Sequence, residues 1–182
     1  AIEDNGDYLE HLLIGGELDV AVMVISNLRD RVALQAEIFE TSPYRLWLPL
    51  GHRLAGADII SVADIVPESL IMLTVDETEE NTGKLMAAFG ARPNVAFRTR
   101  SVEAVRSLVA TGAGIALLPD LVYRPWSLEG DRIESRDVSG QLPAVQVGIV
   151  WRKGSGLPET ARDFIKVAQL HRGGRGRTER SA

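Results

Sequence analysis

Hydroxyl and guanidinium side chains gather just before a segment, residues 101–111, that is predicted to form a helix. Arg98, Thr99, Arg100 and Ser101 stand at this helix start, and Thr74 stands beside the start of another predicted helix. A helix N-terminus offers free N–H groups, and hydroxyl and guanidinium donors beside it make a ready site for an anion. The two arginines favour a small carboxylate or another small anion. Simple capping of the helix by Ser101 explains the same spacing equally well, so both interpretations stay open.

A second polar cluster consists of carboxylates. Asp76, Glu77, Glu79 and Glu80 stand close together and could bind a cation or supply an acid–base pair. Acidic residues are also favourable at the positive end of a helix dipole, where solvent surrounds them. The charged, solvated start of a helix is therefore the favoured interpretation.

The residues that usually carry enzyme chemistry are absent or scattered. The chain has no cysteine, which excludes thiol nucleophiles, disulfides, cysteine-ligated zinc and iron–sulfur clusters. His11, His52 and His171 lack the short spacing of a metal or general-base site. No P-loop or GxSxG motif occurs, and the glycines at 112–114 follow a predicted helix, the reverse of a dinucleotide-binding order. We expect no enzyme activity, metal or cofactor.

Composition places the chain among ordinary globular proteins. It has 182 residues, of which 45% are hydrophobic and 25% charged, with a formal net charge of −5. No apolar run approaches the roughly 20 residues that cross a bilayer. Residues 171–182 are rich in arginine and glycine and could touch phosphate, but a disordered basic tail is the favoured interpretation. An acidic body of this kind is a poor nucleic-acid surface by itself.

Buried-type strands alternate with amphipathic helices along most of the chain. Asn5 is predicted to cap a helix that ends at Gly15–Gly16, and Ser61 with Asp64 predicts a capping box. A last helix after Pro158 is expected to turn Ala161, Phe164, Ile165 and Ala168 inward. Further segments are predicted as the end of a strand at 1–4, strands at 18–25, 44–50, 69–75, 94–98, 115–119 and 145–151, and turns at 121–140. The alternation indicates an α/β fold with a mainly parallel sheet.

Five ordered strings carry a resemblance to a known family. They are GGELDVAVM at 15–23, LPLGHRLAG at 48–56, SVADIVPESLIML at 61–73, SVEAVRSLVATGAGIALLP at 101–119 and VGIVWRKG at 147–154. Together they resemble the effector-binding domain of LysR-type transcriptional regulators, over most of residues 1–170.

The resemblance implies a type 2 periplasmic-binding-protein-like fold, in which two Rossmann-like α/β lobes are joined by crossing strands. Lobe I would hold residues 1–41 and 146–170, and lobe II residues 42–145. The first strand and first helix of lobe I are expected to be missing from this sequence.

The resemblance also implies a small-molecule site between the lobes. Matching positions are Val24, Ile25 and Ser26 in lobe I, and Arg100 and Ser101 in lobe II, with Thr74, Arg98 and Thr99 beside them. Val24 stands where some members carry a polar residue, which argues against a sulfate-like ligand.

The implied function is the sensory domain of a cytoplasmic DNA-binding transcription factor. Its partners would be a small effector, DNA through an N-terminal helix-turn-helix domain outside this sequence, and a second copy in a homodimer or tetramer, with no membrane. The alternative is a periplasmic solute-binding protein of the same fold. An enzyme on this fold is disfavoured for want of a visible nucleophile.

Overall fold

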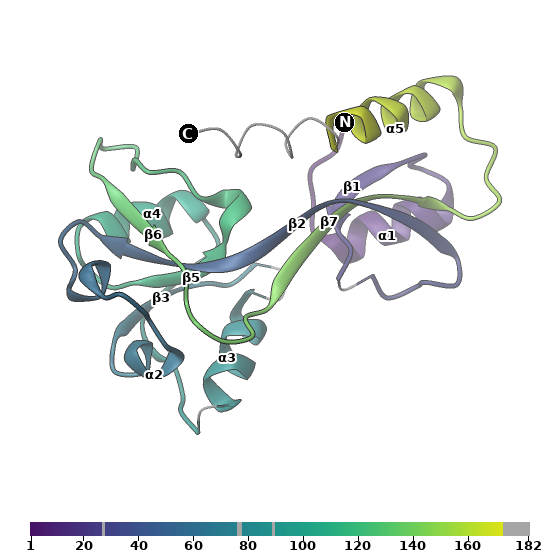
Figure 1. Ribbon diagram of the computed structural model, residues 1–182. Coiled ribbons are helices and arrows are strands. Elements are labelled where there is room, and N and C mark those ends of the chain that lie inside the picture. Colours follow the sequence, from purple (N-terminus) through teal and green to yellow (C-terminus); the bar gives the residue numbers. More distant parts are fainter. Residues whose placement is uncertain (27, 76–77, 89, 173–182) are drawn as a thin grey trace. The chain divides into compact units, whose positions relative to one another are not determined.

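The computed structural model describes residues 1–26, 28–75, 78–88 and 90–172. Residues 171 and 172 are described by their backbone alone. The chain divides into two compact units, one made of residues 1–41 with the segment from residue 145 onward, the other of residues 42–144 (Figure 1). Most of the predicted basic tail therefore lies outside the described residues. None of the described helices is both long and apolar enough to cross a membrane.

The first unit packs helices against a small antiparallel sheet. Its elements are α1 (Gly6–Gly15), β1 (Ala21–Val24), the first part of β2 (Leu34–Pro49), β7 (Ala144–Arg152) and α5 (Glu159–Arg172). Strand β7 lies between β1 and β2, and it runs antiparallel to β1 with Val24 opposite Val147. The Asn5 side chain accepts a hydrogen bond from the Tyr8 N–H and so begins α1, and Gly16, with a φ of 79°, ends it. Leu13 and Val150 are fully buried in the core of this unit.

The second unit is a mixed sheet with helices beside it. Its elements are the rest of β2, η1 (Arg53–Gly56), α2 (Val62–Ile65), β3 (Ser69–Leu73), α3 (Thr78–Ala88), β4 (Asn94–Thr99), α4 (Val102–Ala110), β5 (Ala116–Pro119), η2 (Asp120–Val122) and β6 (Ile133–Arg136). Strand β3 pairs with β4 in parallel and meets Ile115, just before β5, through a parallel bridge. Strand β2 pairs antiparallel with both β5 and β6.

Helices α3 and α4 belong to opposite faces of the second unit's sheet. From β3 the chain crosses through α3 to β4, and then through α4 back past β3 to β5. Crossovers between parallel strands are right-handed in nearly all proteins, so two steps in opposite directions are expected to place their helices on opposite faces. Strand ends and helix starts then meet at the carboxyl edge of the parallel strands, where α/β proteins bind ligands.

Strand direction is the main point at which the sequence prediction of the sheet is wrong. Three of the strand pairs, β1 with β7 and β2 with β5 and β6, are antiparallel, so the sheet is mixed rather than mainly parallel. A strand buried on both faces has the same apolar sequence pattern whether its neighbours run parallel or antiparallel to it. The pattern therefore does not predict the direction of pairing. Strand β2 also begins ten residues before the expected 44–50 segment, and β6 lies in the segment predicted as turns.

Two smaller expectations also differ from the structure. Residues 1–4 form no strand, and α1 begins at Gly6 after its cap Asn5. Helix α5 buries Ala161 and Ile165 as predicted, but 47% of Phe164 is exposed.

Candidate functional site

The N-terminus of α4 is built by two side chains that hold its first turn. The Ser101 hydroxyl accepts a hydrogen bond from the Ala104 N–H at 3.2 Å, and the Ser101 N–H donates to the Thr99 hydroxyl at 3.1 Å. Within the described part of the chain, the N–H groups of Val102 and Glu103 have no hydrogen-bond partner, as is usual at a helix start. Two backbone donors of this turn therefore have no acceptor among the residues that the structure describes.

Two neighbouring strand ends bring threonines beside this turn. Strands β3 and β4 run parallel, with Leu73 opposite Thr99. The next residue after β3, Thr74, donates to the Thr99 carbonyl from its N–H at 2.8 Å and from its hydroxyl at 3.3 Å. The structure thus joins Thr74, Thr99 and Ser101 through hydrogen bonds into one polar edge.

The two arginines of this segment differ in what they contact. The Arg98 guanidinium lies 3.0 Å from a carboxylate oxygen of Glu79 in α3, which forms an ion pair. Arg100 is exposed and makes no ion pair with any described residue. Among the described residues, Arg98 thus has a carboxylate partner and Arg100 has none.

A buried arginine of α4 links this helix to neighbouring residues. Arg106 is 3% exposed, pairs with the Glu103 carboxylate, and donates to the Val122 carbonyl at 2.9 Å. Its pairing offsets the one negative charge in the first turn of α4. Helical periodicity could have predicted the burial of Arg106, because it lies four residues after Val102 on the face of α4 that carries the apolar residues.

In the first unit, the predicted residues lie at the end of β1. Val24 pairs with Val147, and the N–H of Ile25 donates to the Gln146 carbonyl at 2.8 Å. The exposed Ser26 accepts from the Gln146 N–H at 3.1 Å through its hydroxyl. These three residues belong to the first unit, and the polar edge around Ser101 belongs to the second.

A buried carboxylate holds the loop that follows Ser26. Glu10 of α1 is 7% exposed and accepts hydrogen bonds from the N–H groups of Arg29 at 3.1 Å and Asp30 at 3.2 Å. Arg31 in the same loop donates to the Ile25 carbonyl at 3.2 Å. No local pattern predicts this role for Glu10, because its partners lie about twenty residues away in the chain.

The described residues of the acidic cluster and His52 are engaged in contacts with neighbouring groups. Asp76 and Glu77 lie outside the described residues, while Glu79 pairs with Arg98 and Glu80 pairs with Lys84 at 2.6 Å. The Nδ1 atom of His52 accepts from the Leu54 N–H at 3.2 Å. Nowhere in the described residues do three histidine or acidic side chains form a group that could hold a metal ion.

Taken together, the mixed α/β units and the connections at β2 and β7 define the class of type 2 periplasmic-binding-protein-like effector domains. The family model for the LysR substrate binding domain matches residues 2–172, and the chain belongs to this family. The resemblance inferred from the sequence is therefore confirmed, as is the fold class.

Known proteins similar to the chain are transcriptional regulators. The DNA-binding transcriptional dual regulator OxyR of Escherichia coli (strain K12) is 29% identical over 153 residues, which cover 80% of this chain and 47% of OxyR. The C-terminal domain of a probable LysR family regulator from Rhodococcus sp. RHA1 superimposes with a TM-score of 0.82 at 28% identity, covering 92% of this chain and 82% of that one.

A second similar structure contains a ligand. The effector binding domain of QuiR in complex with shikimate has a TM-score of 0.75 at 14% identity, covering 94% of this chain and 79% of that one, a likeness of fold alone. The chain spans about half the length of the curated relatives it matches.

Proposed function

We propose that this chain is the effector-sensing part of a LysR-type transcription factor, and that it binds a small anionic effector at the start of α4. The observation that carries the proposal is the set of unused donors at one helical turn. The N–H groups of Val102 and Glu103 are free, and the Arg100 guanidinium beside them has no ion-pair partner among the described residues. A carboxylate at this position would accept charge-assisted hydrogen bonds and would interact favourably with the helix dipole.

The local charges favour an anion of modest size. Glu103 is the one acidic residue in the first turn of α4, and its ion pair with Arg106 offsets its repulsion of an anion. Thr74 and Thr99 add hydroxyl groups next to the same turn. The carboxylate ligand shikimate, bound to QuiR, supports the same ligand class.

The remaining parts of the proposal rest on family membership. The two compact units are proposed as the two lobes, residues 1–41 with 146–170 and residues 42–145. Val24, Ile25 and Ser26 are proposed as further effector contacts, as the family resemblance implies. Effector binding would favour one of two lobe arrangements, which is a population shift rather than chemistry on the ligand.

The whole protein is proposed to act in the cytoplasm as a homodimer or tetramer. It would contact DNA through a helix-turn-helix domain. This is supported by its relatives, since OxyR is a DNA-binding regulator and another relative is an HTH-type transcriptional regulator. Effector binding to this chain would then change how the helix-turn-helix domain binds its operator DNA.

The test of this proposal measures the affinity of small carboxylates. Isothermal titration with shikimate, malate and benzoate is expected to find at least one that binds saturably. The Arg100→Ala variant should bind it about tenfold or more weakly, because a charge-assisted contact is lost. The matched control is Arg92→Ala, which removes another exposed arginine without an ion pair in the described chain and should leave affinity within twofold. Equal affinities of the Arg100→Ala variant and the unmodified chain would overturn the proposed site.

A further inference from the structure

An arginine outside the predicted set lies beside two of the predicted effector residues in the first unit. The Nη2 atom of Arg31 donates hydrogen bonds to the carbonyls of Ile25 at 3.2 Å and Ser26 at 3.4 Å. The guanidinium therefore lies at the carboxyl end of β1, although Arg31 itself belongs to the loop between β1 and β2. Arg31 is exposed, and its Nε and Nη1 groups carry N–H donors that no described residue accepts.

The backbone of Arg31 is held on both sides. Glu10 accepts hydrogen bonds from the N–H groups of the two preceding residues, at 3.1 and 3.2 Å. The Asp30 carboxylate accepts from the N–H groups of the two following residues, at 3.1 and 2.7 Å. A side chain on a backbone that is already ordered loses less conformational entropy when it binds a ligand.

The charges around this loop favour an anion. Arg31 makes no ion pair with any described residue, and neither does Lys153, whose ammonium donates to the Arg31 carbonyl at 2.9 Å. The two nearby carboxylates, Glu10 and Asp30, each accept hydrogen bonds from backbone N–H groups, which offsets part of their negative charge. The positive charge of Arg31 is therefore available to an acid group.

The neighbouring Arg29 differs in this respect. Its guanidinium lies 2.9 Å from the Asp7 carboxylate, so its charge already has a partner. Arg31 is instead comparable with Arg100 of the second unit. Each is an exposed arginine beside predicted effector residues, and neither pairs with a carboxylate among the described residues. Two such cations suit a ligand that carries two acid groups.

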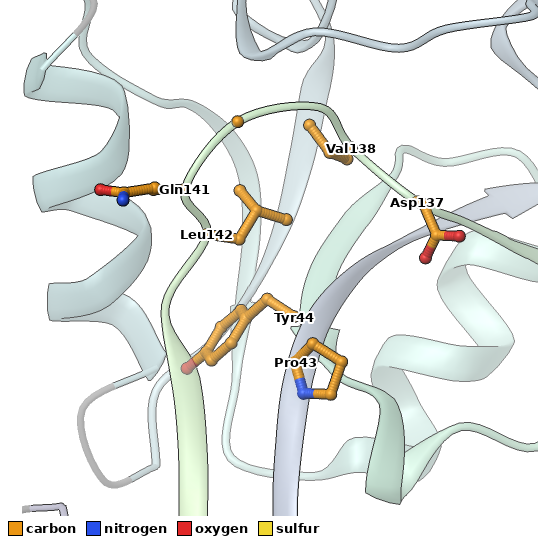
Figure 2. A pocket seen from close by; sticks show the side chains of 7 residues that line it. Pro43, Tyr44, Asp137, Val138, Gln141 and Leu142 are labelled. Carbon is orange, nitrogen blue, oxygen red and sulfur yellow. The ribbon is translucent and has the colours of Figure 1, made fainter.

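A pocket of the second unit, of about 610 Å³, offers no comparable group (Figure 2). It is lined by Pro43, Tyr44 and the segment 137–142, in which Asp137 is the one charged residue and would repel an anion. Tyr44 is 2% exposed, and in Figure 2 its ring extends toward α3, where its hydroxyl contacts the Asn81 amide at 3.4 Å. The Arg31 guanidinium is therefore the better candidate for a further anion contact.

We propose that Arg31 determines effector specificity by binding a second acid group, so that the effector is a small dianion such as a dicarboxylate. The inference rests on the function proposed above and names the ligand class of that site. One acid group binds at the start of α4 with Arg100, and the other accepts hydrogen bonds from Arg31. The exposed Ser26 hydroxyl lies beside the Arg31 guanidinium and can add a further donor.

The test compares malate with its monomethyl ester, in which one carboxylate is masked, by isothermal titration at neutral pH. The unmodified chain should bind malate about tenfold more tightly than the ester, because the ester loses one charge-assisted contact. Arg31→Ala should weaken malate binding about tenfold and leave ester binding within about twofold. Arg31→Gln, which keeps an N–H donor without the charge, should act in the same direction. The matched control is Arg29→Ala, which removes an arginine already paired with Asp7 and should leave malate binding within about twofold.

Two results would overturn the role of Arg31. One is malate binding no tighter than ester binding in the unmodified chain, and the other is unchanged malate affinity in both Arg31 variants. Amide hydrogen exchange at Arg29 and Asp30 shows whether the loop is retained, and Arg31→Gln decides the matter if Arg31→Ala loosens it. If Arg100→Ala weakens malate binding while the Arg31 variants do not, only the role of Arg31 is refuted. If no carboxylate binds, or Arg100→Ala changes nothing, the proposed function fails and the role of Arg31 fails with it.

Discussion

The guanidinium carbon of Arg106 lies 5.6 Å from the ring centroid of Trp47, over the face of the indole. Both side chains are buried, and Tyr123 meets the same indole edge-on with ring centroids 5.7 Å apart. A cation over an aromatic face is attracted by the ring quadrupole, and the attraction grows when water is excluded. This contact fixes α4, whose first turn carries the proposed effector site, to strand β2.

Arg106→Ala is expected to lower the free energy of unfolding by about 2–3 kcal/mol. The substitution removes the cation–π contact, leaves the Val122 carbonyl without its donor and opens a cavity against Trp47. Urea unfolding followed by tryptophan fluorescence measures the change. The exposed Arg92→Ala control should stay within about 0.5 kcal/mol. Equal stability of the two variants would show that Arg106 does not anchor the helix.

Gly114 and Gly148 are predicted to tolerate no side chain. A Cβ atom at Gly114 would lie 2.6 Å from the Ser69 carbonyl oxygen, and one at Gly148 would lie 2.6 Å from the Glu37 carbonyl oxygen. Backbone atoms of paired strands cannot move aside cheaply, so each Gly→Ala change should cost about 2 kcal/mol or more.

The matched glycine control lies in helix α3. Gly83 has open space around it, and Gly83→Ala should stabilise the chain by about 0.5–1 kcal/mol through helix propensity and a less flexible unfolded state. Chemical denaturation of the three variants compares them directly. A Gly114→Ala protein as stable as Gly83→Ala would contradict the close approach.

Asp64 makes the stability of the second unit depend on acid pH. Hydrogen bonds from the hydroxyl and the N–H of Ser61, at 2.6 and 2.8 Å, hold the pKa of Asp64 below its ordinary value of 3.8, and Arg53 adds to this effect. A pKa lower in the folded than in the unfolded chain contributes stability above the unfolded value. That contribution is lost as the pH falls through the folded value.

Ser61→Ala should therefore raise the pKa of Asp64 toward 3.8. It should destabilise the chain at pH 6, and the difference from the unmodified chain should shrink as the pH falls below 3.8. NMR titration of the carboxyl carbon gives the pKa, and melting curves give the stability. Ser139→Ala, at an exposed serine, serves as the control. A pKa of Asp64 that does not move in Ser61→Ala would refute the capping role.

Glu10 is predicted to order the loop after β1. Glu10→Ala leaves the N–H groups of Arg29 and Asp30 without their acceptor and should cost about 1–3 kcal/mol. Amide hydrogen exchange at Arg29 and Asp30 should accelerate by tenfold or more. Glu17→Ala, at an exposed glutamate, should leave these rates unchanged. Unchanged exchange in Glu10→Ala would show that the loop is held by other contacts.

The features that the sequence predicted well are those decided by near neighbours in the chain. Asn5, Ser61 and Ser101 cap helices because each acts on N–H groups or side chains within three residues. Gly16 ends α1 for the same local reason, since it adopts the left-handed conformation there. The order of helices and buried strands followed from hydrophobic periodicity, which also needs only a short window.

The features that escaped prediction depend on distant partners. The pairing of Arg98 with Glu79 joins residues 19 apart, so the sequence could not separate Arg98 from Arg100, which pairs with none of the described residues. Strand β6 reads as Ile133, Glu134, Ser135 and Arg136, a mostly polar segment that becomes a strand through pairing with β2. Phe164 lies on a helix whose buried stripe is narrower than its apolar residues suggest.

The most direct test of the central claim is an amide-shift titration of the 15N-labelled chain with the tightest-binding carboxylate among shikimate, malate and benzoate. The account predicts the largest saturable shifts at the N–H groups of Val102 and Glu103, and their loss in Arg100→Ala. Saturable binding whose shifts spare the first turn of α4, or no binding by any of the three carboxylates, would contradict it.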